Sequence, residues 1–250
     1  MIDIHSHVLY GLDDGARTFD DSIAMLRMAE ASGTTDLVAT PHASLDYRYD
    51  PDLIAQRLAQ LSSATKIRLY SGCDFHLSYD NIQDAIDHPR KYTIDHKSYL
   101  LVEFSDLLIF RNTSEIFGRL QDAGMIPVIT HPERNGLLRQ RLDNLQTWVE
   151  EGARIQVTGQ SLTGRFGSRA QQFSETLLDR GLVHFIASDG HDCERRPPTL
   201  NEAHAWLAKR RGETVANLLC IENPRAALEG SPVELLSAAT PRKWYQVWNR

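Results

Sequence analysis

Short apolar runs alternate with segments of helical periodicity along most of the chain. Each run is too short for a typical helix and does not alternate with polar residues, as expected of a strand that is buried on both faces. We therefore predict seven strands, at residues 2–5, 35–40, 67–72, 99–104, 126–130, 154–158 and 182–187.

The segments between these runs predict helices. Phe19, Ile23 and Leu26 recur at i, i+4 and i+7, and the same spacing begins at Ile54 and at Ile116. This spacing places apolar side chains on one face of a helix. The helix starts are indicated by Thr18 with Asp21, by Thr199 with Glu202 and by Asp50 before Pro51, and the helix ends by Gly33, Gly124, Gly152 and Gly181.

Seven strand–helix units with short connections predict a parallel sheet, because parallel strands need a crossover between them. The first strand is not followed by a Gly-x-Gly-x-x-Gly turn, so a dinucleotide-binding fold is disfavoured. We predict an α/β fold, a (β/α)7 TIM-like barrel, with one domain over residues 1–250 and a C-terminal tail from about residue 231.

Composition and charge narrow the class of protein. The chain has 250 residues, of which 42% are hydrophobic and 24% charged, as in soluble globular proteins. A net charge of −6 and a pI near 5.9 disfavour nucleic acid as a partner. The chain contains no long apolar run and no apolar leader, so we expect no membrane insertion. The odd number of cysteines without paired spacing favours a reducing cytoplasm.

Side chains that can bind metal ions follow one predicted strand after another. The carboxyl ends of the strands hold the active site of an α/β barrel, because the loops converge there. His5 and His7 are two residues apart on an extended chain, so both imidazoles point the same way, and Asp189 and His191 repeat this spacing. The candidate ligands are His5, His7, Asp14, His42, Asp74, Glu103, His131, Asp189 and His191.

Nine nitrogen and oxygen donors exceed what one ion can bind, so the set predicts two or three divalent ions. We expect Mn²⁺, with Fe²⁺, Co²⁺ or Zn²⁺ as alternatives. A single His-x-His is common by chance, and Asp74 alone could cap a helix. An unpaired carboxylate such as Glu103 inside an apolar strand is costly, however, and Glu103 can bridge two ions. Among the other histidines, His76 is the nearest along the chain to a candidate ligand.

A cysteine-based phosphatase is excluded by spacing. It needs a thiolate and an arginine six positions later. The residues six positions after Cys73, Cys193 and Cys220 are Tyr79, Thr199 and Ala226.

Six segments together form a specific pattern. They are His5-Ser6-His7, Gly11-Leu12-Asp13-Asp14-Gly15, Ala39-Thr40-Pro41-His42, Leu101-Val102-Glu103-Phe104, Thr130-His131-Pro132-Glu133-Arg134 and Ala187-Ser188-Asp189-Gly190-His191. This pattern resembles the PHP (polymerase and histidinol phosphatase) superfamily, and more closely its capsular-polysaccharide tyrosine phosphatases of the CpsB/YwqE type. The resemblance covers residues 1–230.

The resemblance implies a distorted seven-stranded barrel and a cytoplasmic, metal-dependent phosphatase. Such enzymes remove phosphate from a tyrosine-rich tail of the bacterial kinase, a polysaccharide co-polymerase, that controls capsular and exopolysaccharide synthesis. By position, the family's phosphate-binding arginines fall on Arg134 and Arg196, and its metal ligands on the residues named above. Asp74 stands where the family usually has Glu, which predicts a weaker third site, and Ala43 stands where it often has a second His.

The expected mechanism is direct attack on phosphorus by a metal-bound hydroxide, without a phosphoenzyme. Arg134 and Arg196 would bind the phosphoryl oxygens, which their planar guanidinium groups can do in bidentate fashion. The group that protonates the leaving phenolate is left open between Asp189 and His191.

Two aromatic segments are candidates for contacts with the substrate. After His42, Tyr47 or Tyr49 could stack on a phenyl ring and Arg48 could meet an acidic neighbour, although both tyrosines could also pack on the barrel. The tail from residue 241, with Trp244, Tyr245 and Trp248, could dock a partner, cover the barrel or form a subunit contact. The oligomeric state stays open.

Three other functions compete with this hypothesis. The same metals would serve a phosphatase for a small metabolite such as histidinol phosphate. An amidohydrolase also begins with His-x-His, but it usually needs a bridging lysine where this chain has Glu103. A catalytically inactive metal-binding regulator of polysaccharide assembly is disfavoured by the intact set of ligands.

Overall fold

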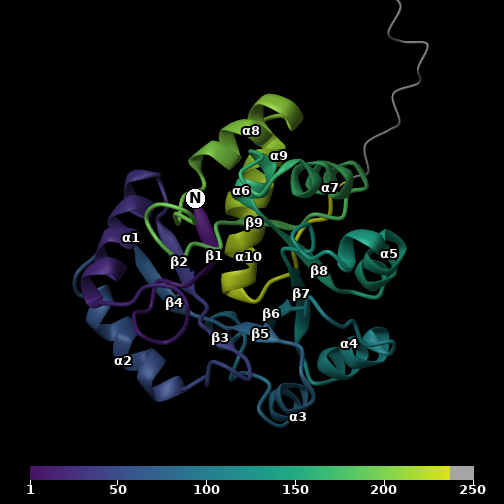
Figure 1. Cartoon of the computed structure of the whole chain (residues 1–250), viewed down its shortest axis with the longest axis horizontal. Coiled ribbons are helices and arrows are strands. Elements are labelled where there is room, and N and C mark those ends of the chain that lie inside the picture. Colours follow the sequence, from purple (N-terminus) through teal and green to yellow (C-terminus); the bar gives the residue numbers. More distant parts are fainter. Residues whose placement is uncertain (237–250) are drawn as a thin grey trace, which may run out of the picture.

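The computed structural model describes residues 1–236, in which parallel strands are surrounded by helices (Figure 1). The strands are β1 (Ile2–Ser6), β2 (Asp36–Ala39), β3 (His42–Ala43), β4 (Arg68–Ser71), β5 (Asp74–His76), β6 (Tyr99–Glu103), β7 (Ile126–Thr130), β8 (Arg154–Thr158) and β9 (Phe185–Ala187).

Helices connect these strands and lie around them. The α-helices are α1 (Phe19–Ala31), α2 (Pro51–Ser62), α3 (Tyr79–Asp87), α4 (Thr113–Asp122), α5 (Leu142–Glu150), α6 (Gly159–Leu162), α7 (Ser168–Asp179), α8 (Asn201–Arg211), α9 (Glu213–Asn217) and α10 (Asn223–Glu229). Shorter helical turns are η1 (Ile94–His96), η2 (Leu138–Gln140) and η3 (Leu218–Glu222).

The strands form two parallel sheets, with the orders β1-β2-β4 and β3-β5-β6-β7-β8-β9. All seven predicted strands are present, and the prediction of an α/β fold with parallel strands is confirmed. The short strands β3 and β5 follow the second and third predicted strands and were not foreseen. Pro41 has no N–H to donate, so the hydrogen-bond ladder is interrupted between β2 and β3.

Most of the predicted helix boundaries are confirmed. Thr18 and Asp21 form a complete capping box at α1, and Asp50 caps α2 ahead of Pro51. The four glycines predicted to end helices all have positive φ, for example Gly152 at 105°. The predicted capping box at Thr199 is wrong, because α8 begins at Asn201 and has no side-chain cap.

Alternation along β6 separates two buried clusters. Leu100 and Val102 belong to the cluster that includes Phe117 of α4, whereas Leu101 belongs to the cluster that includes Val128 of the neighbouring strand. One apolar layer therefore joins strands to helices, and a second lies among the strands themselves.

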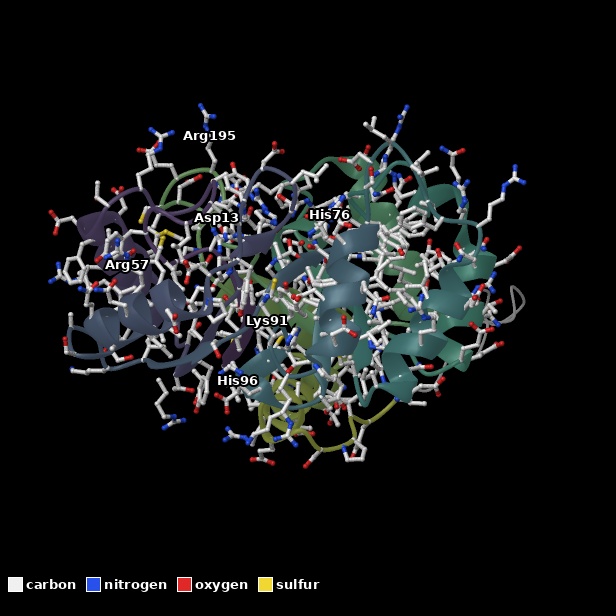
Figure 2. All side chains as sticks on the ribbon, turned by 90° about the horizontal axis from the view of Figure 1, so that it is seen from below. Asp13, Arg57, His76, Lys91, His96 and Arg195 are labelled. Atoms are coloured by element: carbon white, nitrogen blue, oxygen red, sulfur yellow. The ribbon has the colours of Figure 1, made fainter. Side chains whose placement is uncertain are left out.

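The carboxyl ends of the strands lie toward one end of the molecule. Figure 2 shows Asp13 and His76, which follow β1 and end β5, toward that end, and His96, which precedes β6, toward the opposite end. None of the helices within residues 1–236 has the length and hydropathy needed to span a bilayer. The tail aromatics Trp244 and Trp248 fall outside the described residues.

Candidate metal centre

All nine predicted metal ligands come together at the carboxyl ends of the strands. Residues from loops and strand ends far apart in sequence offer donor atoms that lie within 4.8 Å of one another in each of four groups. The groups are His7, Asp14, His42 and His191; His5, Asp74 and His131; His5, His7 and Asp189; and His42, Asp74 and Glu103.

Asp74 has the more central position of the two carboxylates at the ends of β5 and β6. It belongs to two of the four groups, whereas Glu103 belongs to one. The Oδ2 atom of Asp74 is 3.5 Å from His5 Nε2 and 3.3 Å from His42 Nδ1. Asp74 Oδ2 thus lies between two groups. Glu103 also faces two histidines, with Oε2 3.5 Å from His42 Nδ1 and Oε1 3.8 Å from His131 Nε2.

Several buried nitrogen and oxygen atoms that could bind a metal ion have no hydrogen-bond partner, which is rare in a folded protein. These atoms are His42 Nδ1, Asp74 Oδ2, Asp189 Oδ1 and His191 Nε2. Imidazole nitrogens and carboxylate oxygens whose lone pairs converge in this way fit divalent transition-metal ions, which would satisfy them.

Two residues that sequence reasoning missed orient the histidines of β1. The Nδ1 atom of His5 lies 3.0 Å from Gln156 Oε1, and that of His7 lies 2.7 Å from Asp13 Oδ2. A partner on Nδ1 fixes the tautomer and directs Nε2 toward the cluster. Gln156 is a polar residue inside an apolar run, and Asp13 adjoins the predicted ligand Asp14.

The Asp13 loop is folded tightly against the centre. Asp13 accepts hydrogen bonds from the backbone N–H groups of Gly15 (2.9 Å) and His42 (3.1 Å). Any Cβ at Gly15 would collide with the carbonyl of His7, so only glycine permits this approach. The loop therefore places Asp14 next to His191 and His42, each 3.3 Å away.

Burial and neighbouring charges set the protonation of the cluster. Burial lowers the pKa of His7, but the Asp13 and Asp189 carboxylates outweigh it and raise that pKa to about 10. Burial, reinforced by Arg134, lowers the pKa of His131 to about 3. Burial alone would raise the pKa of Asp189, but His5 and Arg134 outweigh it and hold the pKa far below its usual range. At neutral pH the Asp189 carboxylate is thus ionised and the His131 imidazole is neutral, whereas His7 carries a proton that a bound metal ion would displace.

Backbone strain is concentrated at this site. His131 and Asp189 have φ of 33° and 52°, values that residues other than glycine rarely adopt. The Asp189 backbone is held by its N–H, which donates to His5 O at 2.9 Å, and by Ser188, which donates its N–H and Oγ–H to the buried carboxylate of Asp3. The surrounding structure therefore fixes a conformation that the chain would not choose locally.

The two predicted phosphate-binding arginines converge on one carboxylate oxygen. Arg134 and Arg196 both bond to Asp189 Oδ2, and the Arg134 guanidinium lies 4.5 Å from the ring centroid of Phe166. Their side chains are 23% and 24% exposed, and that of Asp14 is 48% exposed. Solvent thus reaches the centre at Asp14 and, to a smaller extent, at the two arginines.

The aromatic residues after His42 have different roles. The Tyr47 ring stacks on His42, with centroids 5.7 Å apart and an interplanar angle of 17°. Tyr49 instead donates its hydroxyl to Gly72 O and packs on Tyr92, so it belongs to the packed interior rather than to the site. His76 lies 4.0 Å from Glu103 at the edge of the cluster.

Comparison with known proteins identifies the family. Residues 1–229 match the family described as capsular polysaccharide synthesis, CpsB/CapC. The chain belongs to this family. This membership confirms the resemblance inferred from the sequence motifs.

Individual relatives cover nearly the whole chain. The tyrosine-protein phosphatase YwqE of Bacillus subtilis is 33% identical over 239 residues, 93% of each chain, and the tyrosine-protein phosphatase CpsB of Streptococcus pneumoniae is 27% identical over 236 residues, 90% of this chain and 97% of that one. A crystal structure from work on YwqE and CpsB, described there as metal-dependent tyrosine phosphatases, superposes with a TM-score of 0.88 at 31% identity, covering 97% and 100% of the two chains. A β-aspartyl dipeptidase with a TM-score of 0.53 at 14% identity, covering 93% of this chain and 74% of that one, shares the fold alone.

Proposed function

We propose that this protein is a cytoplasmic, metal-dependent protein-tyrosine phosphatase. Its substrate would be the phosphotyrosine tail of a bacterial tyrosine kinase and polysaccharide co-polymerase that controls capsular or exopolysaccharide synthesis. The relatives named as tyrosine-protein phosphatases support this activity. The observation that carries the proposal is the cluster of unpartnered buried donors beside two arginines on an open face.

The nine donors would hold two or three divalent ions, with Mn²⁺ expected. When bound, such ions activate water at neutral pH and neutralise charge that develops on the phosphoryl oxygens. Gln156 and Asp13 keep the Nε2 atoms of His5 and His7 directed at the ions. The strained Asp189 backbone, held through Ser188, keeps its carboxylate in place.

Arg134 and Arg196 would bind the phosphoryl group. Both reach the same face of Asp189, so two planar guanidinium groups are already directed at one small region. Charge-assisted bonds from such groups favour a dianionic phosphate and strengthen as its oxygens gain charge. The partial exposure of these arginines and the half-exposed Asp14 favour a phosphorylated side chain of a macromolecule over an enclosed metabolite.

We also propose that residues 1–250 form one domain in which the two sheets act as a single distorted (β/α)7 barrel. Hydrogen bonds between the sheets support this arrangement. Asp189 N–H, after β9, donates to His5 O of β1 at 2.9 Å, and Ser6 forms a parallel bridge with Gly190. On the other side, Asp74 N–H of β5 donates to Pro41 O at 3.2 Å, close to the point where β2 gives way to β3.

The test is a phosphatase assay of metal-stripped protein with Mn²⁺, Fe²⁺, Co²⁺ or Zn²⁺ restored. Matched phosphotyrosine and phosphoserine peptides and histidinol phosphate serve as substrates. We expect metal-dependent turnover with kcat/KM highest for phosphotyrosine, because a phenolate with a pKa near 10 leaves more readily than an alkoxide. A large preference for histidinol phosphate would establish a metabolite phosphatase instead, and no turnover with any metal would establish a non-catalytic protein.

A further inference from the structure

Large apolar side chains stand exposed on the loops that follow β3, β5 and β6. We call Leu45, Tyr79, Leu107 and Leu108 the apolar rim; their exposed fractions are 92%, 78%, 92% and 59%. The three strands are neighbours in one sheet. Because neighbouring strands are about 4.8 Å apart, the three loops begin within about 10 Å of one another. Exposed apolar groups gathered in this way mark interaction sites.

The loops that carry the apolar rim are bonded to one another. The Asn81 side chain donates to Ala43 O at 2.8 Å and to His76 O at 2.9 Å, which joins the loops after β3 and β5. Leu77 N–H donates to Glu103 O at 3.0 Å, which joins β5 to β6. The backbones that carry Leu45 and Tyr79 are therefore tied to each other. The loop of Leu107 and Leu108 is held at its start by Asn135, which donates to Phe104 O and Ser105 O.

The apolar rim is continuous with the candidate metal centre. The same strands carry His42, Asp74 and Glu103, so the rim lies on the side of the centre that these three residues form. A cavity of about 540 Å³ lies beside it. Leu45 and three tyrosines line it together with charged groups, among them Arg48 and Asp80. That volume suits individual side chains of a bound segment.

We infer that the apolar rim binds the residues next to the phosphotyrosine and selects segments that carry apolar or aromatic side chains there. This inference rests on the proposed function and adds the sequence preference of the substrate. The rim gives these side chains a place to bury apolar area, so it acts mainly on the affinity for the peptide and not on the chemical step.

The size of the rim favours a peptide over a second copy of the chain. An aromatic side chain buries roughly 150–250 Å², so four large side chains offer on the order of 600 Å². A stable interface takes about 800 Å² from each partner. The rim alone is therefore too small for a stable dimer, and it fits a segment of a few residues.

The charges beside the rim disfavour an anionic membrane. An exposed aspartate adjoins each apolar tip, namely Asp46, Asp80 and Asp106, and the same loops carry Arg48 and Arg111. The surplus of carboxylates would repel lipid phosphate, whereas a basic or neutral peptide would be accepted.

The experiment compares two phosphotyrosyl peptides that differ only in having leucine or serine beside the phosphotyrosine. The holoenzyme, a Leu107→Ser/Leu108→Ser variant and a Leu45→Ser variant are assayed on both peptides and on p-nitrophenyl phosphate. The matched control is Leu235→Ser, because Leu235 is also exposed (61%) but lies at the amino ends of the strands, away from the rim. Its neighbour Glu234 is bonded to Asn223, and Asn223 donates to His184 O just before β9.

We expect the wild-type enzyme to have a KM about 10-fold lower for the leucine peptide, and the double variant to lose most of that preference with kcat little changed. Turnover of p-nitrophenyl phosphate should be equal in all variants. A preference that persists in both rim variants, or no preference in the wild type, overturns the inference while the phosphatase activity stands. If the wild type hydrolyses none of the three substrates, the proposed function fails and the inference fails with it.

Two further measurements decide between occupants. In analytical ultracentrifugation, a wild-type dimer that becomes monomeric in Leu107→Ser/Leu108→Ser would show that the rim joins two copies. Flotation of the wild type, but not of this variant, with phosphatidylglycerol-containing vesicles would show a membrane contact. Either result overturns the peptide-binding role, and we expect neither.

Discussion

Two charged clusters at opposite ends of the strands differ in how completely the hydrogen-bonding atoms of their buried carboxylates are paired. At the amino end of β2, the buried carboxylate of Asp36 accepts hydrogen bonds from Arg68 (2.6 and 2.7 Å), Tyr70 (3.1 Å) and Thr35 (2.7 Å). At the carboxyl ends, the candidate metal centre brings carboxylates and imidazoles together and leaves four buried donors unpartnered.

The difference separates a structural cluster from a functional one. The carboxylate of Asp36 is satisfied by the chain itself, so it needs nothing further. The centre has donors directed at one another, an arrangement that only a cation can satisfy. A single unpartnered atom does not indicate a metal site. The Nε2 atom of His184 is also buried without a hydrogen-bond partner, but burial lowers the pKa of His184 to about 3, so the ring is neutral. His184 belongs to none of the four groups of metal-binding atoms found among the described residues.

Removal of metal should have the largest effect. Exhaustive chelation is expected to lower kcat/KM for p-nitrophenyl phosphate by at least about 1,000-fold, because bound ions supply several kcal/mol of transition-state stabilisation. Mass spectrometry of the purified protein should find at least two divalent ions per chain. Full activity in a preparation shown to be metal-free would mean that the unpartnered donors have another purpose.

Asp74→Asn should be the next most damaging change. Asp74 lies between two groups of donors, so its loss affects two ion sites, whereas Glu103 belongs to one group and is partly exposed. We expect a loss in kcat/KM of about 100-fold or more for Asp74→Asn and a smaller loss for Glu103→Gln. Metal content measured beside activity should fall more in the first variant; the reverse order would restore Glu103 as the bridging residue.

Arg134→Ala and Arg196→Ala should each weaken catalysis by roughly 10- to 150-fold, since a charge-assisted bond contributes about 1.5–3 kcal/mol. The metal content should stay at the wild-type level, and Lys substitutions should recover only part of the loss because lysine cannot bind in bidentate fashion. If either alanine variant is purified without metal, its arginine supports Asp189 and does not bind phosphate.

Features that depend on local sequence pattern were predicted correctly. Thr18 and Asp21 act within one turn of helix, and His5 and His7 share a face because of strand geometry, so both predictions needed no tertiary information. The nine candidate ligands were found because each lies at the carboxyl end of a recognisable strand or in the loop that follows it. The short strands β3 and β5 gave no such signal, because two or three residues carry no periodicity.

What depends on the tertiary fold was missed. Asp13 and Asp14 are equivalent in sequence, and only the tight approach of Gly15 to His7 directs one to the His7 ring and the other to the cluster. Gln156 reaches His5 across 151 positions of the chain. Thr199 fits a capping box, but its N–H donates to Pro197 O at 2.8 Å and α8 begins only at Asn201.

Asp13→Asn tests whether the residue that orients His7 contributes to metal binding. Loss of the charge on the Nδ1 side of His7 should weaken metal binding or activity by about 10- to 100-fold, the range typical of residues that orient a ligand. Titration of the metal-stripped variant with Mn²⁺ should show a raised Kd and recovery of activity at high metal concentration. Activity that is equal to wild type at limiting metal would remove Asp13 from the site.

The smallest effect on activity, and a measurable one on stability, is expected at the satisfied cluster. Asp36→Asn removes a charge that Arg68 and Tyr70 bond. Because the Arg68 side chain is 63% exposed, we expect Tm to fall by only about 1–4 °C at pH 7 and kcat/KM to stay unchanged. Burial raises the pKa of Asp36, but the bonds from Arg68, Thr35 and Tyr70 outweigh it and hold the pKa below its usual 3.8. Because the pKa of Asp36 is lower in the folded than in the unfolded state, the ionised carboxylate stabilises the fold at every pH above its unfolded-state pKa. This stabilisation is lost as the pH falls toward the folded-state pKa. The Tm difference between wild type and variant should therefore be constant near neutrality and shrink below about pH 4. A difference that grows in acid, or a fall in kcat/KM, would show that the two ends of the strands are not independent.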